Sequence, residues 1–208
     1  IIGREQLRAN LIVELESEYS QEEADADTLE LWLLRLVPDR DLDLYQLQLD
    51  LLSEQVAGYY DPDRDELFII SDAGNGGELG AEGEYTASHE YVHALQDQHF
   101  DLETVQGDTD GDADRGLGIT SLIEGDASLS STLYLFQYMG DRAGDLFSGE
   151  LGSTSVIDSA PAYVSESLIF PYEHGIEFAT ALYLAGGNAA IDAAFADPRS
   201  YFNRYAVL

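Results

Sequence analysis

The stretch His89-Glu90-Tyr91-Val92-His93 has the residue types and the spacing of a metal-binding helix. Two histidines four positions apart lie on one helix face, about one turn apart, and both imidazoles can reach one zinc ion at about 2.0–2.1 Å. Glu90 lies beside the first histidine and can point at a water molecule on the metal. The chain holds only 4 His, so a chance pair that frames a glutamate would be unusual. The pattern predicts a metal site that includes His89 and His93.

The third ligand has two candidates, and the first is His99. It lies ten positions after His89, as in the metzincin pattern HExxHxxGxxH, but Gln96 stands where that pattern has glycine. The glycine ends the helix, which lets the last histidine turn back to the metal. Residues 94–98 contain no helix breaker. On a continuous helix His99 would be rotated by about 120° from His93 and displaced by about 9 Å. We therefore predict that His99 lies at the helix end, away from the metal.

The second candidate is Glu124, in the stretch LIEGDASL. The segment 117–139 is apolar, and a carboxylate buried in an apolar helix is unfavourable unless it is paired or bound to a metal. A glutamate that faces the solvent is the alternative. Zinc coordination accounts for Glu124 better, because it completes a His2Glu site with the fourth position open for water. Asp126 follows two positions later, on a different helix face, where it would support a ligand or the structure.

Four stretches together resemble a family of bacterial and archaeal zinc metallopeptidase-like proteins that belongs broadly with the gluzincins. They are EQVAGYYDPDRDELFI (54–69), HEYVHALQDQHFDL (89–102), SLIEGDASL (121–129) and IFPYEHGIEFATALYLAGG (169–187). The resemblance covers nearly the whole chain, and it is weakest over the N-terminal helices. It implies a zincin-like fold and a zinc-dependent peptidase that acts on peptides or proteins.

The resemblance also implies a role for individual residues. Zinc would be held by His89, His93 and Glu124, with Glu90 as the catalytic acid/base. One strand of a hairpin at 59–70 would line the cleft and pair with an extended peptide.

The oxyanion formed during peptide hydrolysis needs a hydrogen-bond donor besides zinc. Tyr172 and His174, in the stretch FPYEHG, are the candidates. Tyr172 follows Pro171 and precedes an expected helix start, which would hold it in place. Packing or surface exposure is the alternative for Tyr172. His174 can instead bind the terminal carboxylate of the substrate or have no catalytic role.

The charge balance indicates a protein built for high salt. The 41 Asp+Glu oppose 9 Lys+Arg, all of them arginine, for a formal net charge of −32. These acids are interspersed with periodic apolar residues, which disfavours a disordered tail and favours a folded domain of the haloarchaeal kind, whose surface repulsion salt screens. Nucleic acid is excluded as a partner by the same charge. Cysteine is absent, so disulfides are excluded, and no apolar run is long enough to span a membrane.

The elements expected around the site are mostly helices. Aromatic and β-branched runs around an Asp/Pro-rich turn predict the hairpin within 56–71. Apolar residues at helical spacing predict helices at 4–18, 28–36, 43–56, 82–98, 117–139, 162–168, 173–185 and 188–195. Residues 21–25 are either a polar break or a helix start, and loops are expected at 72–83, 101–116 and 148–161.

The fold class is therefore α+β and mostly helical, with a small antiparallel sheet before the histidine helix. We expect one zincin-like domain over 1–208, with an N-terminal helical part at 1–55 and a catalytic core at 56–208. The N-terminal helices either belong to the catalytic domain or cover it as a prosegment. The abrupt start at Ile1 suggests a fragment, so an extracellular or cell-surface location is compatible with a signal or anchor that was removed.

Two other functions stay open. The first is a binding or assembly domain that keeps zinc only for stability, although a structural site needs no general base such as Glu90. The second is a metal-dependent hydrolase of a non-peptide amide. A calcium loop at the alternating acids Asp108, Asp110, Asp112 and Asp114 is disfavoured, because Ala113 stands where an EF-hand needs glycine.

Overall fold

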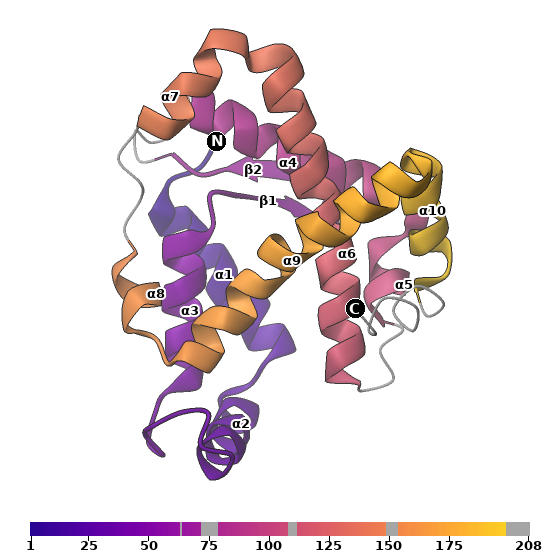
Figure 1. Cartoon of the computed structure of the whole chain (residues 1–208). Helices are drawn as coiled ribbons and strands as arrows, with labels where there is room; N and C mark the ends of the chain where they lie inside the picture. Colours follow the sequence, from indigo (N-terminus) through magenta and orange to yellow (C-terminus); the bar gives the residue numbers. More distant parts are fainter. Residues whose placement is uncertain (63, 72–78, 108–111, 149–153, 199–208) are drawn as a thin grey trace.

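The computed structural model describes residues 1–62, 64–71, 79–107, 112–148 and 154–198. These residues are mostly helical and include one two-stranded antiparallel sheet, as predicted (Figure 1). The sheet pairs β1 (Gly58–Asp61) with β2 (Glu66–Ile69) and comes before the histidine helix α4 in the chain. The α-helices are α1 (Arg4–Glu18), α2 (Gln21–Leu33), α3 (Leu44–Gln55), α4 (Ala81–Phe100), α5 (Leu102–Gly107), α6 (Ala113–Tyr134), α7 (Ala143–Ser148), α8 (Ser155–Ser159), α9 (Ala162–Gly186) and α10 (Asn188–Ala196).

The start of α2 settles the alternative at residues 21–25 in favour of a helix start. Ser20 accepts a hydrogen bond from the Glu23 N–H at 3.3 Å, and the Glu23 carboxylate accepts one from the Ser20 N–H at 2.8 Å. This reciprocal pair satisfies N–H groups that would otherwise lack partners at a helix N-terminus. The acidic run is therefore the first turn of α2, where negative charge is favourable.

The sheet lies between the N-terminal helices and α4. On one face, Tyr59 stacks on Phe68 with ring centroids 4.8 Å apart, and its hydroxyl accepts a hydrogen bond from Asn10 of α1 at 2.7 Å. On the other face, the Tyr60 hydroxyl donates to Asp97 of α4 at 3.1 Å. Successive side chains of a strand point to opposite faces, so these two tyrosines connect the sheet to both neighbours.

Two stretches that the sequence predicts as loops contain short helices. Within 101–116, α5 forms because Leu102 and Val105 are buried in the core. In the same stretch α6 begins at Ala113, because the Asp112 carboxylate accepts a hydrogen bond from the Arg115 N–H at 3.2 Å and caps the helix. Within 148–161, α8 forms a further short helix.

α9 is one continuous helix where the sequence predicts two, at 162–168 and 173–185. Pro171 lies inside it and is buried. An internal proline removes a backbone hydrogen bond and costs ~3 kcal/mol, and the packing of α9 along α6 offsets this cost. Tyr172 therefore lies in the middle of a helix, and the prediction that it precedes a helix start is wrong.

α6 and α9 form the most extensive helix pair among the described residues, and they meet at two glycines. A Cβ atom at Gly125 would overlap with the Gly175 carbonyl group, and a Cβ atom at Gly175 would overlap with the Ser121 carbonyl oxygen. The two backbones are therefore in direct contact. Gly125 follows Glu124, and Gly175 lies about one helical turn after Tyr172, so this contact sets how closely the two side chains approach.

We expect Gly125→Ala to lower the free energy of unfolding by about 1–3 kcal/mol, because the added methyl group must push the two helices apart. Denaturant unfolding at one fixed salt concentration measures the change. Gly144→Ala is the control, since nothing lies within 4 Å of a Cβ atom there. It should be neutral or slightly stabilising. Equal unfolding free energies of the two variants would contradict the tight helix contact.

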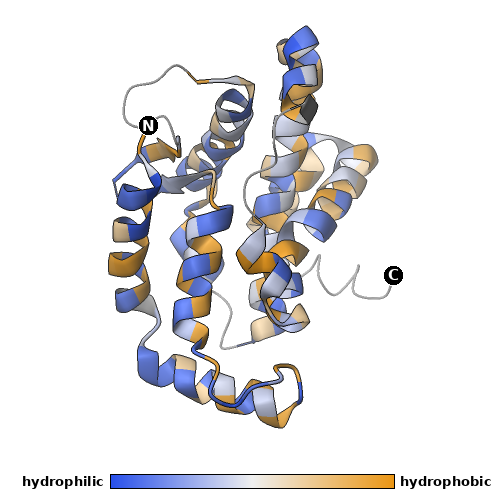
Figure 2. Cartoon of the chain, turned by 90° about the vertical axis from the view of Figure 1, so that its left-hand side faces the viewer, coloured by the Kyte–Doolittle hydropathy of each residue, from blue (hydrophilic) through white to orange (hydrophobic). Residues whose placement is uncertain are grey.

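The core lies where α5, α6, α9 and α10 meet. Its residues include Leu102, Ile119, Leu122, Leu182 and Phe195. The helices carry hydrophobic and hydrophilic residues side by side, which suits elements with one face in contact with protein and one in water (Figure 2). Within the described part of the chain, no helix is long and apolar enough to cross a membrane.

Candidate metal centre

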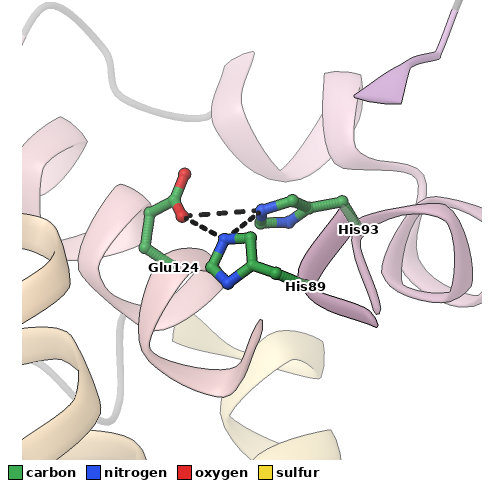
Figure 3. A group of neighbouring side chains, drawn as sticks. All are labelled: His89, His93 and Glu124. Carbon is green, nitrogen blue, oxygen red and sulfur yellow. Dashed lines mark hydrogen bonds and ion pairs between the residues drawn. The ribbon is translucent and has the colours of Figure 1, made fainter. Parts of the chain in front are cut away.

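Three side chains from two helices converge on one point (Figure 3). His89 and His93 lie one turn apart on α4, and Glu124 comes from the middle of α6. Glu124 Oε2 lies 3.1 Å from His89 Nε2 and 3.5 Å from His93 Nε2, and the two Nε2 atoms are 3.1 Å apart. The three residues, which we call the triad, are close enough to bind one metal ion.

α4 continues through the point where a metzincin helix would end. It reaches Phe100, and the His99 ring accordingly lies in the last turn, exposed, with its Nδ1 atom 2.8 Å from the Leu95 carbonyl oxygen of the same helix. His99 is therefore not brought to the triad, in line with the prediction from Gln96.

Gln96 has a second role that the sequence does not reveal. Its side chain is buried, and its Oε1 atom lies 2.9 Å from His93 Nδ1. Its amide nitrogen donates to the Ile123 carbonyl oxygen at 3.0 Å and to Asp126 at 2.8 Å. A backbone carbonyl can only accept, so the amide nitrogen must face α6 and the amide oxygen must face His93. When His93 is neutral, it therefore carries its proton on Nδ1, and Nε2 presents its lone pair to a metal.

Replacing Gln96 by leucine should lower metal affinity by about 10–100-fold, because His93 loses the partner that holds its ring and its tautomer. A competitive titration with a chromogenic chelator measures the affinity. Gln98→Leu is the control on the same helix, since Gln98 is exposed. If both variants bind metal as tightly as the wild type, Gln96 does not orient His93.

The metal-free triad is an ion pair in a buried setting. Burial alone would lower the pKa of His93, but the hydrogen bond and the negative charge of Glu124 outweigh it and raise that pKa to about 9. Burial alone would raise the pKa of Glu124, but the hydrogen bonds and charges of the two histidines lower it to about 2. At neutral pH the metal-free site therefore holds a protonated His93 beside an ionised Glu124.

Metal binding should release a proton from His93 at any pH below about 9, because a metal ligand must be a neutral imidazole. Apparent affinity should fall about tenfold for each pH unit below that value, and the dependence should vanish above it. Calorimetric titration at pH 7 in buffers of different ionisation enthalpy counts the released protons. A count of zero would show that His93 is neutral in the metal-free protein.

Glu90 lines the same cavity beside the triad as His89 does, and it is only 6% exposed. Burial raises the pKa of Glu90, while the charges of His93 and His89 and a hydrogen bond from the Tyr60 N–H of β1 oppose the shift. A carboxylate of raised pKa holds a proton more readily than a free one, which suits a group that takes up a proton and returns it.

The structure brings Tyr172 to the triad but not His174. The Tyr172 ring lies over the His89 ring at 6.3 Å between centroids. The residue as a whole is 46% exposed, but its hydroxyl is buried close to Glu124 and Glu90. Burial and the negative charges of these two carboxylates raise the pKa of Tyr172. The hydroxyl therefore stays protonated and can donate.

His174 follows Tyr172 by two positions on α9 and points elsewhere. Its ring is exposed and contacts the ring of Phe170, with centroids 4.5 Å apart, and the Glu177 carboxylate at 3.6 Å. On the continuous helix α9, the His174 ring does not lie where it could donate a hydrogen bond to an oxyanion at the triad.

A cavity of about 450 Å³ opens beside the triad, and we call it the cleft. Its walls include His89, Glu90, Gly58, Tyr172 and Ile157, from four different elements. Because the Ile70 N–H donates a ladder hydrogen bond to the Ala57 carbonyl oxygen at 2.9 Å, the next residue, Gly58, points its N–H and C=O away from β2. The outer edge of β1 thus borders the cleft, as expected for the hairpin.

Glu54, at the end of α3, binds the start of α8, which forms one side of the cleft. Its carboxylate accepts hydrogen bonds from the Ser155 hydroxyl at 2.9 Å and from the Val156 and Ile157 N–H groups at 2.9 and 3.3 Å. The first backbone N–H groups of a helix have no partner within that helix, so Glu54 caps α8 from another part of the chain. Ile157 is thereby fixed in the cleft wall.

Of the predicted acidic loop, residues 108–111 lie outside the described residues, and Asp112 caps α6.

Comparison with known proteins found no matching family model, no matching curated protein and no matching solved structure.

Proposed function

We propose that this chain is a zinc-dependent peptidase with a zincin-like fold. The observation that carries the proposal is the triad together with Glu90, which borders the same cleft. The order of elements supports the fold assignment: a hairpin, then the helix with both histidines, then a helix with the glutamate. A site that only stabilised the fold would not need a buried carboxylate beside its ligands.

The donor set supports zinc as the metal. Tetrahedral zinc with bonds of about 2.0–2.1 Å separates its ligand atoms by about 3.3–3.4 Å. The triad atoms are separated by 3.1, 3.1 and 3.5 Å. Two imidazoles and one carboxylate are also the ligands of catalytic zinc in many peptidases. Bound there, zinc would polarise the scissile carbonyl and make its water ligand more acidic.

The side chains around the triad would handle the protons. Glu90 accepts a proton from the attacking water and passes it to the leaving amine, as its raised pKa favours. Tyr172 donates a hydrogen bond to the developing oxyanion. Gly58 offers its N–H and C=O to the backbone of an extended peptide, which binds without regard to side chains.

Metal analysis and proteolysis in molar salt test this function. The purified protein should contain one zinc per chain and should cut a denatured, fluorophore-labelled protein, and removal of zinc with a chelator should abolish cleavage. If zinc binds one to one and no peptide bond is cut at any salt concentration, the chain is not a peptidase.

A further inference from the structure

A second cavity of about 550 Å³ lies between the N-terminal helices and α9, and we call it the side groove. It is lined by α2, α3, the start of α6 and the first two turns of α9. Leu52 and Leu168 line both the side groove and the cleft. The two cavities therefore lie next to each other, and these two side chains form a wall that both share.

The lining of the side groove is mostly aliphatic. Leu31 comes from α2, Leu51 and Leu52 come from α3, and Val164 and Leu168 come from α9. Tyr163 is 43% exposed at the groove. A large apolar concavity is unusual on a chain of net charge −32, and exposed apolar concavities commonly mark binding sites.

The carboxylates at the side groove decide which segments it would accept. Asp27 and Glu30 of α2 are exposed at its lining. They would repel an acidic segment and tolerate a neutral or basic one. Salt screens this repulsion, whereas apolar burial persists in salt.

We propose that the side groove binds apolar side chains of a peptide substrate several residues away from the scissile bond. The inference rests on the proposed function. The position next to the cleft points to the occupant, because a chain bound at the triad that extends past Leu52 and Leu168 reaches the groove. A peptide whose chain ends near the scissile bond does not reach the groove. It therefore lacks the binding energy that contacts in the groove would provide.

A peptide series of increasing length tests the proposal. A cleavage site is first identified in the digest of a denatured protein. Peptides of that site are then made short, extended by four apolar residues on either side, and extended by four acidic residues. One of the two apolar extensions should raise kcat/KM at least tenfold over the short peptide, and the acidic extensions should not.

Variants of the groove identify where that gain arises. Tyr163→Ala and Leu31→Asn should remove most of the gain from the apolar extension and leave the short peptide unchanged. Tyr183→Ala is the matched control, since Tyr183 also lies on α9, is 37% exposed and borders neither cavity. Zinc content and circular dichroism confirm that each variant is folded.

The outcomes separate the two proposals. If neither short nor long peptides are cut, the proposed function fails. If both are cut with equal kcat/KM, or if the groove variants behave like Tyr183→Ala, the peptidase stands and the side groove inference is overturned. If Tyr163→Ala instead converts a dimer to a monomer in sedimentation, the groove binds a second copy of the chain, which also overturns the inference.

Discussion

Glu90→Gln is expected to lower the rate of peptide hydrolysis by about 10²–10⁴-fold and to leave bound zinc unchanged. Glutamine has the shape of glutamate, and its amide oxygen can still accept the hydrogen bond from the Tyr60 N–H. It cannot take a proton from water at neutral pH. The loss should therefore appear in kcat, with KM nearly constant.

Initial rates on one labelled substrate, with metal content measured on the same samples, check this expectation. Glu82→Gln is the matched control, because Glu82 is an exposed acid on the same helix, α4. It removes one negative charge without touching the site. A Glu90→Gln variant that cuts as fast as Glu82→Gln would assign the proton transfer to another group.

Glu124→Gln should weaken zinc binding by more than 100-fold, since even the loss of a residue that only supports a ligand costs 10–100-fold. The carboxamide is a poor zinc ligand, and the change also removes the negative charge that pairs with His93. His99→Ala should bind zinc as the wild type does, because the His99 ring lies at the exposed end of α4.

Chelator competition on both variants decides between the two candidates for the third ligand. The opposite result, with zinc lost in His99→Ala and retained in Glu124→Gln, would mean that the helix end unwinds to bring His99 to the metal. Thermal unfolding without zinc provides a further readout. Without zinc, the Glu124→Gln variant should unfold at a lower temperature than the wild type, because it lacks the ion pair with His93.

Local signals predicted much of the fold. The α1 bounds agree with the apolar spacing, and the hairpin lies within 56–71. The histidine helix also lies where it was predicted, two residues longer at its C-terminus. These elements depend on residues close in sequence. By contrast, Pro171 is a strong helix breaker by itself, and only the packing of α9 on α6 explains why the helix continues through it.

The two histidines of the triad were predictable for a similar reason, because the spacing of a histidine pair on a helix is a local property. The surroundings of the triad were not. Gln96 signalled only that α4 continues, whereas its hydrogen bonds go to Ile123 and Asp126 on another helix. Tyr172 and His174 were equal candidates in the sequence, and they differ only through the direction in which α9 presents each one.

The contact between Gly125 and Gly175 bears on how relatives of this protein can be recognised. Because neither position accepts a Cβ atom, both glycines should persist wherever the same two helices carry the site. The same holds for the buried amide that orients the second histidine. Divergent chains of this architecture should therefore share a short signature: His-Glu-x-x-His-x-x-Gln, then Glu-Gly-Asp, then Tyr-x-x-Gly. The acidic surface and the N-terminal helices can vary around it until overall similarity is lost.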